Sequence, residues 1–313
     1  MNLKKTVRMN KTTGKIIKSV GGFFHTETSD GLLLCNARGV FRLQNITPVA
    51  GDNVVIDTTD SSPVITEILE RKNHIVRPPL ANLDAAVIVV STVEPVPNKL
   101  ILDKLIAIFE NKDIEPVLLF TKIDKQEEAE LRDIYRKAGF VTFAVSNTDN
   151  TGFDELRGFL PCKTSAFIGN TGVGKSSTLN SLFPGLQLET AEISRKLGRG
   201  KHTTRVVELH RIPENPVEAG IAAAGSAGYI ADTPGFSTVE AAKYGELASD
   251  DVGLCFREFV PFLGTCKFGG CTHVKEDGCA VIAAKDDGKI TQSRFDSYVR
   301  IYEEAYKNER TYK

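Results

Sequence analysis

Short apolar stretches separated by turn-forming residues make up the first quarter of the chain. Pairs such as Asp30-Gly31 and Gly51-Asp52 favour tight turns between these stretches. About five short strands within about 65 residues predict a small β-barrel over residues 12–76, and an oligonucleotide-binding (OB-type) barrel is one such form. The pattern by itself indicates a β domain without showing that the domain binds nucleic acid. The expected strands include Gly14–Val20, Gly31–Cys35, Gly39–Leu43 and Asn53–Asp57.

After residue 80 the pattern changes to continuous apolar runs that alternate with helical stretches. Runs that are apolar at every position are typical of strands buried on both faces of a parallel sheet. Strands alternating with helices predict an α/β fold, with helices on both faces of the sheet. The expected strands are 84–91, 116–120, 141–145 and 164–169, and the expected helices are 98–110, 127–138 and, near the end of the chain, 293–307.

The segment Gly169-Asn170-Thr171-Gly172-Val173-Gly174-Lys175-Ser176 matches the phosphate-binding motif GxxxxGK[ST] in full. Its glycines allow backbone N–H groups to turn inward around phosphates, and Lys175 is expected to neutralise the β- and γ-phosphates. Ser176 is expected to bind magnesium, and Ser177 to complete the nucleotide contacts. A chance glycine-rich turn is the alternative, but the motif follows an apolar strand and precedes a run that can form a helix.

Two further segments carry groups that a nucleotide and its magnesium ion require. Asp232-Thr-Pro-Gly235 follows an apolar strand; we expect Asp232 in the magnesium shell and the Gly235 N–H near the γ-phosphate. The polar loop 198–205 contains Thr203 and Thr204. A threonine in such a loop can close over magnesium when the γ-phosphate is present, which predicts Thr204 as a magnesium ligand and Thr203 as a nucleotide contact.

Base recognition is predicted for Thr121-Lys122-Ile123-Asp124, at the end of a buried strand. The Asp124 carboxylate can accept hydrogen bonds from both N1–H and the exocyclic amine of guanine, a donor pair that adenine lacks. The Lys122 stem can lie along the base, and the backbone after the next strand, at Ser146 and Asn147, can donate to guanine O6. Thr121 stands where the usual pattern has asparagine, so a weaker hydrogen bond to the phosphate loop or the base is expected. A solvated turn is the alternative for this short motif.

The order of these motifs is informative in itself. In an ordinary guanine-nucleotide domain the phosphate loop comes first and the base-reading segment follows far downstream. Here residues 121–124 precede residues 169–176. The reversed order predicts a circularly permuted P-loop GTPase domain.

A cluster of cysteines near the C-terminus predicts a metal site. Cys266, Cys271, His273 and Cys279 form the pattern C-x4-C-x-H-x5-C, and three thiolates with one imidazole suit a structural zinc ion in a mainly helical domain. A redox cluster and unligated buried thiols remain alternatives. Cys255 is a less favoured substitute ligand, and Cys35 and Cys162 are expected in the core.

Composition adds limits rather than a function. The hydrophobic fraction of 41%, the charged fraction of 25% and the net charge of -1 are those of an ordinary globular protein. The basic start is either a solvated tail or an anion-binding arm. No membrane-length apolar run or signal peptide is apparent, so a cytoplasmic monomer without a membrane partner is expected. The basic residues of the start are Lys4, Lys5, Arg8, Lys11, Lys15 and Lys18.

The β domain, the reversed nucleotide motifs and the Cys3His segment together resemble the ribosome small-subunit-dependent GTPase A (RsgA) family. The resemblance covers nearly the whole chain, with Lys201 and the Ala/Gly-rich loop near residue 222 as departures. It implies a barrel contacting ribosomal RNA over residues 1–76, a permuted GTPase domain over 77–240 and a zinc-binding docking domain over 241–313. The implied activity is GTP hydrolysis, stimulated by the small ribosomal subunit during its late maturation.

His202 is the expected water-orienting catalytic group, acting beside Lys175. Many GTPases place a glutamine just after the DxxG segment, but that position is Phe236 here, which predicts slow intrinsic turnover. The resemblance points to His202 as well; a merely polar loop residue is the alternative. Because the chain runs from Gly235 into the cysteine segment, we expect hydrolysis to reorient that domain and drive release from the subunit.

Two other functions are compatible with the sequence. One is an RNA-binding assembly factor that uses GTP only as a structural ligand. The other is a GTPase that acts on a protein or membrane partner, with the β domain as an interaction module.

Overall fold

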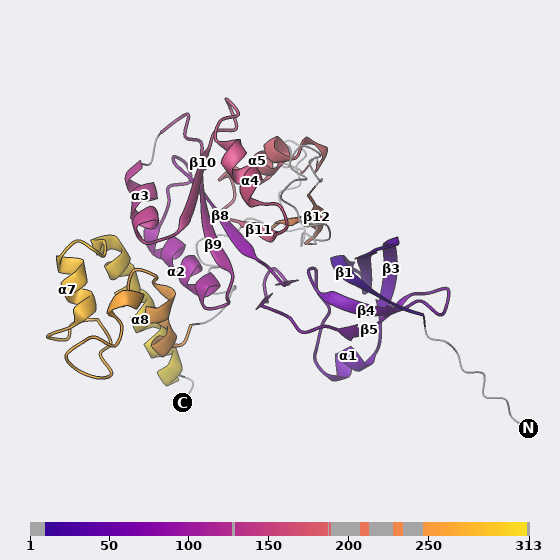
Figure 1. The fold of residues 1–313 in the computed structure, drawn as a ribbon, viewed down its shortest axis with the longest axis horizontal. Coiled ribbons are helices and arrows are strands. Elements are labelled where there is room, and N and C mark those ends of the chain that lie inside the picture. The colour runs from indigo at the N-terminus through magenta and orange to yellow at the C-terminus, as the bar shows by residue number, and fades with distance from the viewer. Residues whose placement is uncertain are drawn as a thin grey trace, which may run out of the picture.

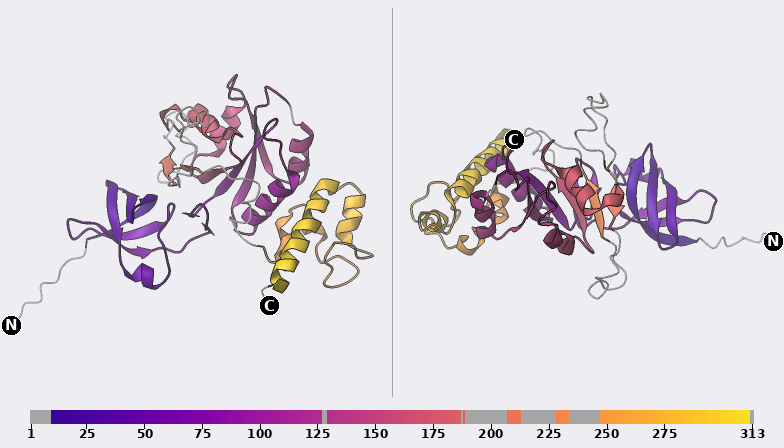
Figure 2. Two further views of the ribbon diagram at one scale, coloured as in Figure 1. Left: turned by 180° about the vertical axis from the view of Figure 1, so that it is seen from behind. Right: turned by 90° about the horizontal axis from the view of Figure 1, so that it is seen from above.

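A central α/β domain lies between a β-barrel and a helical C-terminal domain. The structure, a computed structural model, describes residues 10–126, 129–186, 188, 207–212, 228–233 and 247–311. The barrel and the C-terminal domain extend from the same side of the central domain, so the molecule has the outline of an arch (Figure 1). The two further views in Figure 2 keep the same order, with the central domain in the middle.

The N-terminal domain is a closed five-stranded barrel, as the sequence predicts. Its strands pair in the order β1-β2-β3-β5-β4. Alternate residues point inward, so that Ile16, Phe24, Cys35, Val54 and Ile65 form one buried core. The strand bounds are β1 Lys11–Val20, β2 Phe23–Thr28, β3 Gly31–Ala37, β4 Asn53–Asp57 and β5 Val64–Ile68.

The strand expected over Gly39–Leu43 is wrong, because Val40–Leu43 forms the short helix α1 between β3 and β4. A strand would place Phe41 and Leu43 on the same face. Only Phe41 enters the barrel core, whereas Leu43 is 85% exposed. A single buried anchor within one turn suits a helix capping the end of the barrel.

The central domain has a six-stranded sheet in the order β10-β9-β8-β11-β13-β12. All neighbouring pairs are parallel except β12 with β13. The predicted α/β fold is therefore confirmed, with one antiparallel strand that the sequence pattern missed. The bounds are β8 Ala85–Ser91, β9 Glu115–Thr121, β10 Val141–Val145, β11 Thr164–Ile168, β12 Leu209–Arg211 and β13 Tyr229–Asp232.

Helices cover both faces of this sheet (Figure 1). Successive residues of β8 point to opposite faces: Ile88 packs in the cluster that includes α2 and α3, and Val87 in the cluster that includes α4 and α5. Burial on both faces explains why the strand is apolar throughout. The helices are α2 Lys99–Glu110, α3 Ala129–Lys137, α4 Phe153–Phe159 and α5 Lys175–Leu182, followed by the 3-10 turn η1 Pro184–Leu186.

The described part of the C-terminal domain is helical, with no strand in residues 247–311. Aromatic residues from α8 and from the turn between η3 and η4 contribute to its core, with Phe259 and Tyr298 ring centroids 4.8 Å apart. The chain therefore does not return to the sheet within these residues. The elements are η3 Ser249–Cys255, η4 Val260–Phe262, α7 Ala280–Asp286 and α8 Gln292–Thr311.

The barrel is attached to the central domain at two places. At the first, the small hairpin of β6 His74–Ile75 and β7 Leu80–Ala81 lies against the barrel, and Ala81 N donates to Ala50 O at 3.0 Å. The backbones approach so closely that a Cβ on Gly51 would lie 2.0 Å from Ala81 O. Only glycine fits at this joint, because its φ of +94° is also left-handed.

At the second place, β1 and β2 contact the edge strand β12 and its neighbour β13. Glu27 accepts from Arg211 at 2.7 Å and from the Tyr229 hydroxyl at 3.0 Å. Lys18 pairs with Glu208 at 2.5 Å, and Lys15 lies over the Tyr229 ring. Two lysines of the basic start therefore face the central domain rather than forming part of a free tail.

The C-terminal domain is attached to α2 by buried charges. Arg294 of α8 donates to Asp103 of α2 at 2.7 Å and to Glu258 at 2.6 Å. The Tyr135 hydroxyl of α3 donates to the same Asp103 oxygen. At the rim, Arg257 pairs with carboxylates at both ends of the α2–β9 connection, Glu110 and Glu115.

Candidate nucleotide site and metal centre

The carboxyl ends of the parallel strands bring the predicted nucleotide residues to one edge of the sheet. Thr121 ends β9, Ser146 follows β10, the phosphate loop follows β11 and Asp232 ends β13. Ligands of open α/β sheets bind at this edge, outside the carboxyl ends of the strands. Residues that are more than a hundred positions apart thus converge on one region.

The phosphate loop passes close to β8 and then starts α5. A Cβ on Gly169 would lie 2.6 Å from Val89 O, so this position requires glycine. The Lys175 ammonium is largely buried and donates to Gly169 O at 2.7 Å and to Asn170 O at 2.9 Å. The lysine head therefore lies within the loop, where it can neutralise phosphate charge.

Ser176 and Asp232 meet at the start of α5. The Ser176 hydroxyl donates to a carboxylate oxygen of Asp232 at 2.9 Å. A hydroxyl and a carboxylate at this spacing can share a hard cation, which prefers oxygen ligands. The structure thus brings together two residues that the sequence separately predicts as magnesium ligands.

The base-reading segment is joined directly to the phosphate loop. Thr121, which is fully buried, donates to Val173 O at 2.6 Å. Threonine in place of asparagine therefore still bonds to the phosphate loop. The Lys122 ammonium donates to Gly172 O at 2.9 Å, and burial lowers the pKa of this lysine. Two consecutive residues thus hold the loop from one side.

Asp124 is exposed at the mouth of the site and is oriented by Ser146. The Ser146 hydroxyl lies 2.9 Å from a carboxylate oxygen of Asp124, and this hydrogen bond lowers the pKa of Asp124. The carboxylate is therefore charged at neutral pH. That is the acceptor form needed to bind two N–H donors of a guanine.

The sequence predicts a role only for the backbone N–H of Asn147. In the structure its side chain also makes hydrogen bonds. Its amide nitrogen donates to Thr178 Oγ1 at 3.2 Å, and its amide oxygen accepts from the Ser181 hydroxyl at 3.3 Å. Both partners belong to α5. The asparagine therefore links the end of β10 to the helix that follows the phosphate loop.

The remaining predicted residues are partly outside the described structure. Ile123 lies in the turn before Asp124, Thr171 is exposed in the phosphate loop, and Ser177 is half-buried in the first turn of α5. The residues expected to close over the γ-phosphate and magnesium lie outside the described residues: His202, Thr203, Thr204 and Gly235.

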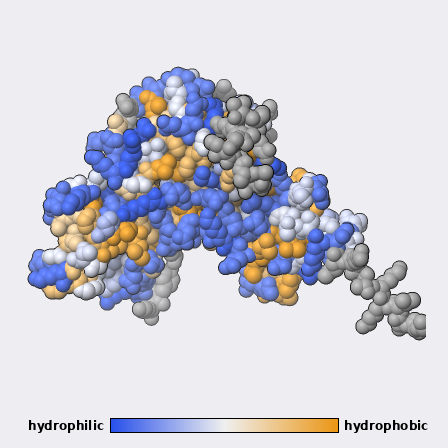
Figure 3. Space-filling view, in the orientation of Figure 1, coloured by the Kyte–Doolittle hydropathy of each residue, from blue (hydrophilic) through white to orange (hydrophobic). Residues whose placement is uncertain are grey.

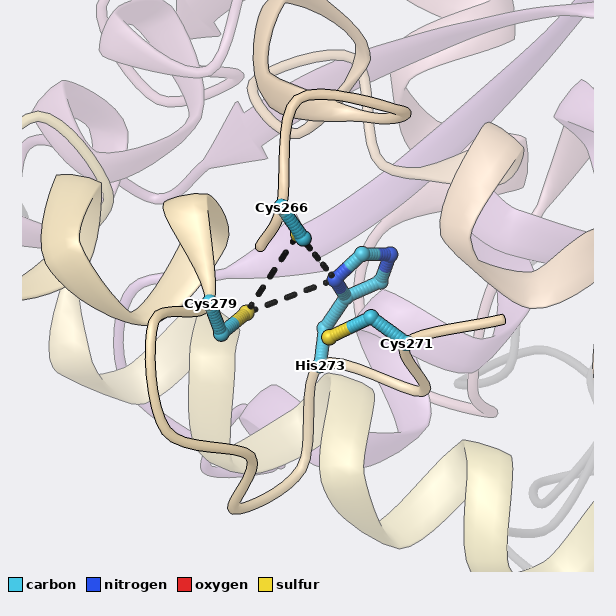
Figure 4. A group of neighbouring side chains, drawn as sticks. All are labelled: Cys266, Cys271, His273 and Cys279. Carbon is cyan, nitrogen blue, oxygen red and sulfur yellow. Dashed lines mark hydrogen bonds between the residues drawn. The ribbon is translucent and has the colours of Figure 1, made fainter. Parts of the chain in front are cut away.

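The four predicted metal ligands are brought together in the C-terminal domain (Figure 4). The candidate ligand atoms of Cys266, Cys271, His273 and Cys279 all lie within 4.8 Å of one another and could hold one metal ion. Nδ1 of His273 is 3.4 Å from Sγ of both Cys266 and Cys279. The backbone N–H groups of Ala280 and Ile282 point at two of the sulfurs, which favours thiolates.

The other cysteines separate clearly from this cluster. Cys255 is buried and directs its thiol to Asp251 O at 3.3 Å, so it is not a substitute ligand. Cys35 lies in the barrel core as expected. The core position expected for Cys162 is wrong: this residue is exposed in the turn before β11.

Comparisons with known proteins agree with this geometry. A family model described as RsgA N-terminal domain matches residues 13–64, and a model described as RsgA GTPase matches residues 68–242, more than half of the chain. The chain belongs to the RsgA GTPase family. It is therefore a GTPase, a hydrolase that acts on GTP, as the motif order predicted.

Relatives in this family are similar over nearly their whole length. The small ribosomal subunit biogenesis GTPase RsgA of Caldanaerobacter subterraneus is 40% identical, over 96% of this chain and 98% of the relative. The protein of the same name from Bacillus subtilis is 39% identical, over 93% and 96%.

Solved structures of RsgA-like proteins share the fold. The crystal structure of YjeQ from Thermotoga maritima has a TM-score of 0.75 and 30% identity, covering 95% of this chain and 99% of that one. YloQ, described as a circularly permuted GTPase, has a TM-score of 0.72 and 30% identity, covering 98% and 99%. The permuted order read from the motifs is thus confirmed. Among the described residues, no helix is both long and apolar enough to span a membrane.

Proposed function

We propose that this RsgA GTPase assists the late maturation of the small ribosomal subunit in the cytoplasm and hydrolyses GTP when the subunit stimulates it. The observation that carries the proposal is the meeting of both nucleotide motifs at one sheet edge, where Thr121 binds Val173 O at 2.6 Å. The names of relatives about 40% identical over nearly the whole chain supply the subunit as partner.

The geometry and charge of each group support the proposed nucleotide roles. Asp124 accepts from guanine, with Ser146 fixing one of its oxygens, and Lys122 lies along the base. Lys175 neutralises the β- and γ-phosphates from within the loop. Thr121, Ile123, Asn147, residues 169–177, Thr203 and Gly235 complete the binding site.

Two metal roles are part of the proposal. Ser176, Asp232 and Thr204 would hold magnesium with the nucleotide, and the ion would neutralise developing phosphate charge. The Cys3His cluster would hold one structural zinc ion. Tetrahedral zinc with Zn–S distances of about 2.3 Å requires sulfurs about 3.8 Å apart, and Cys266 and Cys279 Sγ are 3.9 Å apart.

The flanking domains would dock the GTPase on the subunit. The barrel, over residues 1–76, would contact ribosomal RNA, the permuted GTPase domain would span 77–240, and residues 241–313 would form the zinc-binding docking domain. On the face shown in Figure 3, hydrophilic residues follow the lower margin of the central domain between the flanking domains, which suits a polar partner. Because Arg294 ties α8 to α2, release after hydrolysis would move α2 and the C-terminal domain together.

An RNA-binding factor that uses GTP only as a structural ligand is the alternative. The described residues provide groups for holding GTP, and the expected water-orienting residue, His202, lies outside them. The two functions differ in the expected role of GTP. A GTPase hydrolyses GTP faster when the subunit is present, whereas the alternative factor needs GTP only to bind the subunit.

GTP turnover, measured with purified small subunits added or withheld, tests the proposal. We expect subunits to stimulate the wild type, and His202→Ala to lose at least about 100-fold of the stimulated rate without a change in GTP affinity. His202→Gln, which can still orient water, should lose less. Unstimulated wild-type turnover together with GTP-dependent subunit binding would favour the alternative. Full stimulated turnover in His202→Ala would remove the catalytic role.

A further inference from the structure

Gly174 lies between two polar side chains, one at the end of β9 and one in the loop after β10. A Cβ placed on this residue would lie 3.6 Å from the Asn147 amide nitrogen and 3.8 Å from the Thr121 hydroxyl. Gly174 is the last residue of the phosphate loop and the N-cap of α5. The end of β9 and the loop after β10 therefore both approach the phosphate loop at the point where α5 begins.

The Asn147 amide uses both of its hydrogen-bonding functions in this position. It donates to Thr178 and accepts from Ser181, which lie one turn apart on α5. An amide offers a donor and an acceptor in one rigid plane, so these two bonds fix the rotation of the side chain. Thr178 is fully buried, which makes its hydroxyl a well-placed partner.

The loop after β10, which contains Asn147, also carries the side chain that contacts the base-reading carboxylate of Asp124. Ser146, next to Asn147 in the chain, has its hydroxyl in contact with the carboxylates of both Asp124, at 2.9 Å, and Asp149. The loop is itself closed by paired hydrogen bonds between the backbones of Ser146 and Thr151, at 3.1 and 3.2 Å. A displacement of Asn147 from α5 would therefore move Ser146 and, through it, Asp124.

We propose that Asn147 is a positioning residue for guanine-nucleotide recognition. Its amide fixes the distance between the base-reading loop and the phosphate helix, so that one nucleotide can satisfy Asp124 and the phosphate loop at the same time. Thr121 makes the equivalent link from β9, and Asn147 provides the second link from β10. The inference rests on the proposed guanine-nucleotide site.

The size of the effect follows from the two hydrogen bonds. Asn147→Ala removes both, and we expect about tenfold weaker GDP binding, since the contributions of neutral hydrogen bonds are modest and not fully additive. Ser181→Ala removes one and should weaken GDP binding about threefold. Asn308→Ala, an asparagine exposed on α8, is the matched control and should change nothing.

The decisive measurement is a comparison of ligands by calorimetry on the full chain. GDP, IDP and ribose 5′-diphosphate differ in the exocyclic amine and in the base. If Asn147 positions the base-reading loop, Asn147→Ala weakens GDP binding, leaves the affinity for ribose 5′-diphosphate within about twofold, and reduces the preference for GDP over IDP. Ser181→Ala shows the same trend at smaller size, which keeps the test valid if Asn147→Ala folds poorly.

Equal weakening of all three ligands would show that Asn147 only supports the fold and would overturn the proposal. Unchanged GDP affinity in both Asn147→Ala and Ser181→Ala would also overturn the proposal. A wild-type chain that binds ADP as well as GDP would instead contradict guanine recognition itself, so the two failures are distinguishable.

Discussion

The barrel and the C-terminal domain are both joined to the central domain by ion pairs, but the two interfaces differ in burial. Arg294 and Asp103, which join the C-terminal domain to α2, are each 1% exposed. In the barrel interface, Arg211 is 51% exposed and Lys18 is 31% exposed. A buried charge left without its partner is strongly destabilising, whereas an exposed pair is weakened by water and salt.

This difference indicates which contacts can open. The C-terminal domain shares its core with α2, since Ala107 of that helix packs in the same cluster as Phe256 and Tyr298. The barrel has a firm backbone joint at Gly51 and Ala81, and its contact with β12 is made by partly exposed polar groups. We therefore expect the C-terminal domain to behave as one body with α2, and the barrel–β12 contact to open at a small cost in free energy.

Loss of the metal ligands should have the largest effect on stability, and this effect should be confined to the C-terminal domain. In Cys279→Ala, or after chelation, we expect residues 247–311 to lose their fold, because a structural metal site contributes on the order of 10 kcal/mol to folding. Limited proteolysis should then cut the C-terminal domain and leave the barrel intact. Cys162→Ala, at an exposed cysteine, is the control. Identical cleavage patterns with and without metal would contradict a structural role.

Breaking the buried pair should have the next largest effect. Arg294→Met leaves Asp103 and Glu258 without their shared cation, and we expect a loss of about 3–5 kcal/mol in the free energy of unfolding of the C-terminal unit. Urea denaturation measures it. The triple replacement with Asp103→Asn and Glu258→Met should recover most of the loss, because no uncompensated charge remains and an amide oxygen at position 103 can still accept from Tyr135. A loss below about 1 kcal/mol for Arg294→Met would place this interface in the same class as the barrel contact.

Removal of the charge on Glu27 should have the smallest effect. Glu27→Gln weakens its contacts with Arg211 and Tyr229, and we expect the free energy of unfolding to fall by less than about 1 kcal/mol at low salt. The difference from wild type should disappear at about 1 M salt, where the screening length is about 3 Å. A salt-independent loss of several kcal/mol would show that the two interfaces are alike after all.

Local pattern was sufficient to predict the parts of the fold that depend on neighbouring residues. The phosphate loop, the buried strands and the Cys3His cluster each lie within a short segment of sequence, so spacing alone identified them. Helices α4 and α7, of seven residues each, and strand β12, of three residues, were missed because segments this short show too little hydrophobic periodicity. Gly39–Leu43 was assigned to a strand because apolar content at this length does not separate a strand from a helical turn.

Contacts between distant residues could not be read from the sequence. Asp103 and Arg294 are 191 positions apart, and each looks like an ordinary charged surface residue within its amphipathic helix. The length of the Thr121 hydrogen bond could not be anticipated, because it depends on where Val173 O points, 52 positions downstream. Asn147 likewise gave no signal for its side chain, since both of its partners lie more than thirty positions away on α5.

The bridge between Lys18 of the barrel and Glu208, just before β12, has a further consequence for solubility. A strand at the edge of a sheet presents unpaired backbone groups that can recruit a strand from another chain. The barrel covers β12 at this edge with charged residues, among them Lys18 and Glu27. A central domain deprived of its barrel would keep its nucleotide loops and expose a ready template for aggregation.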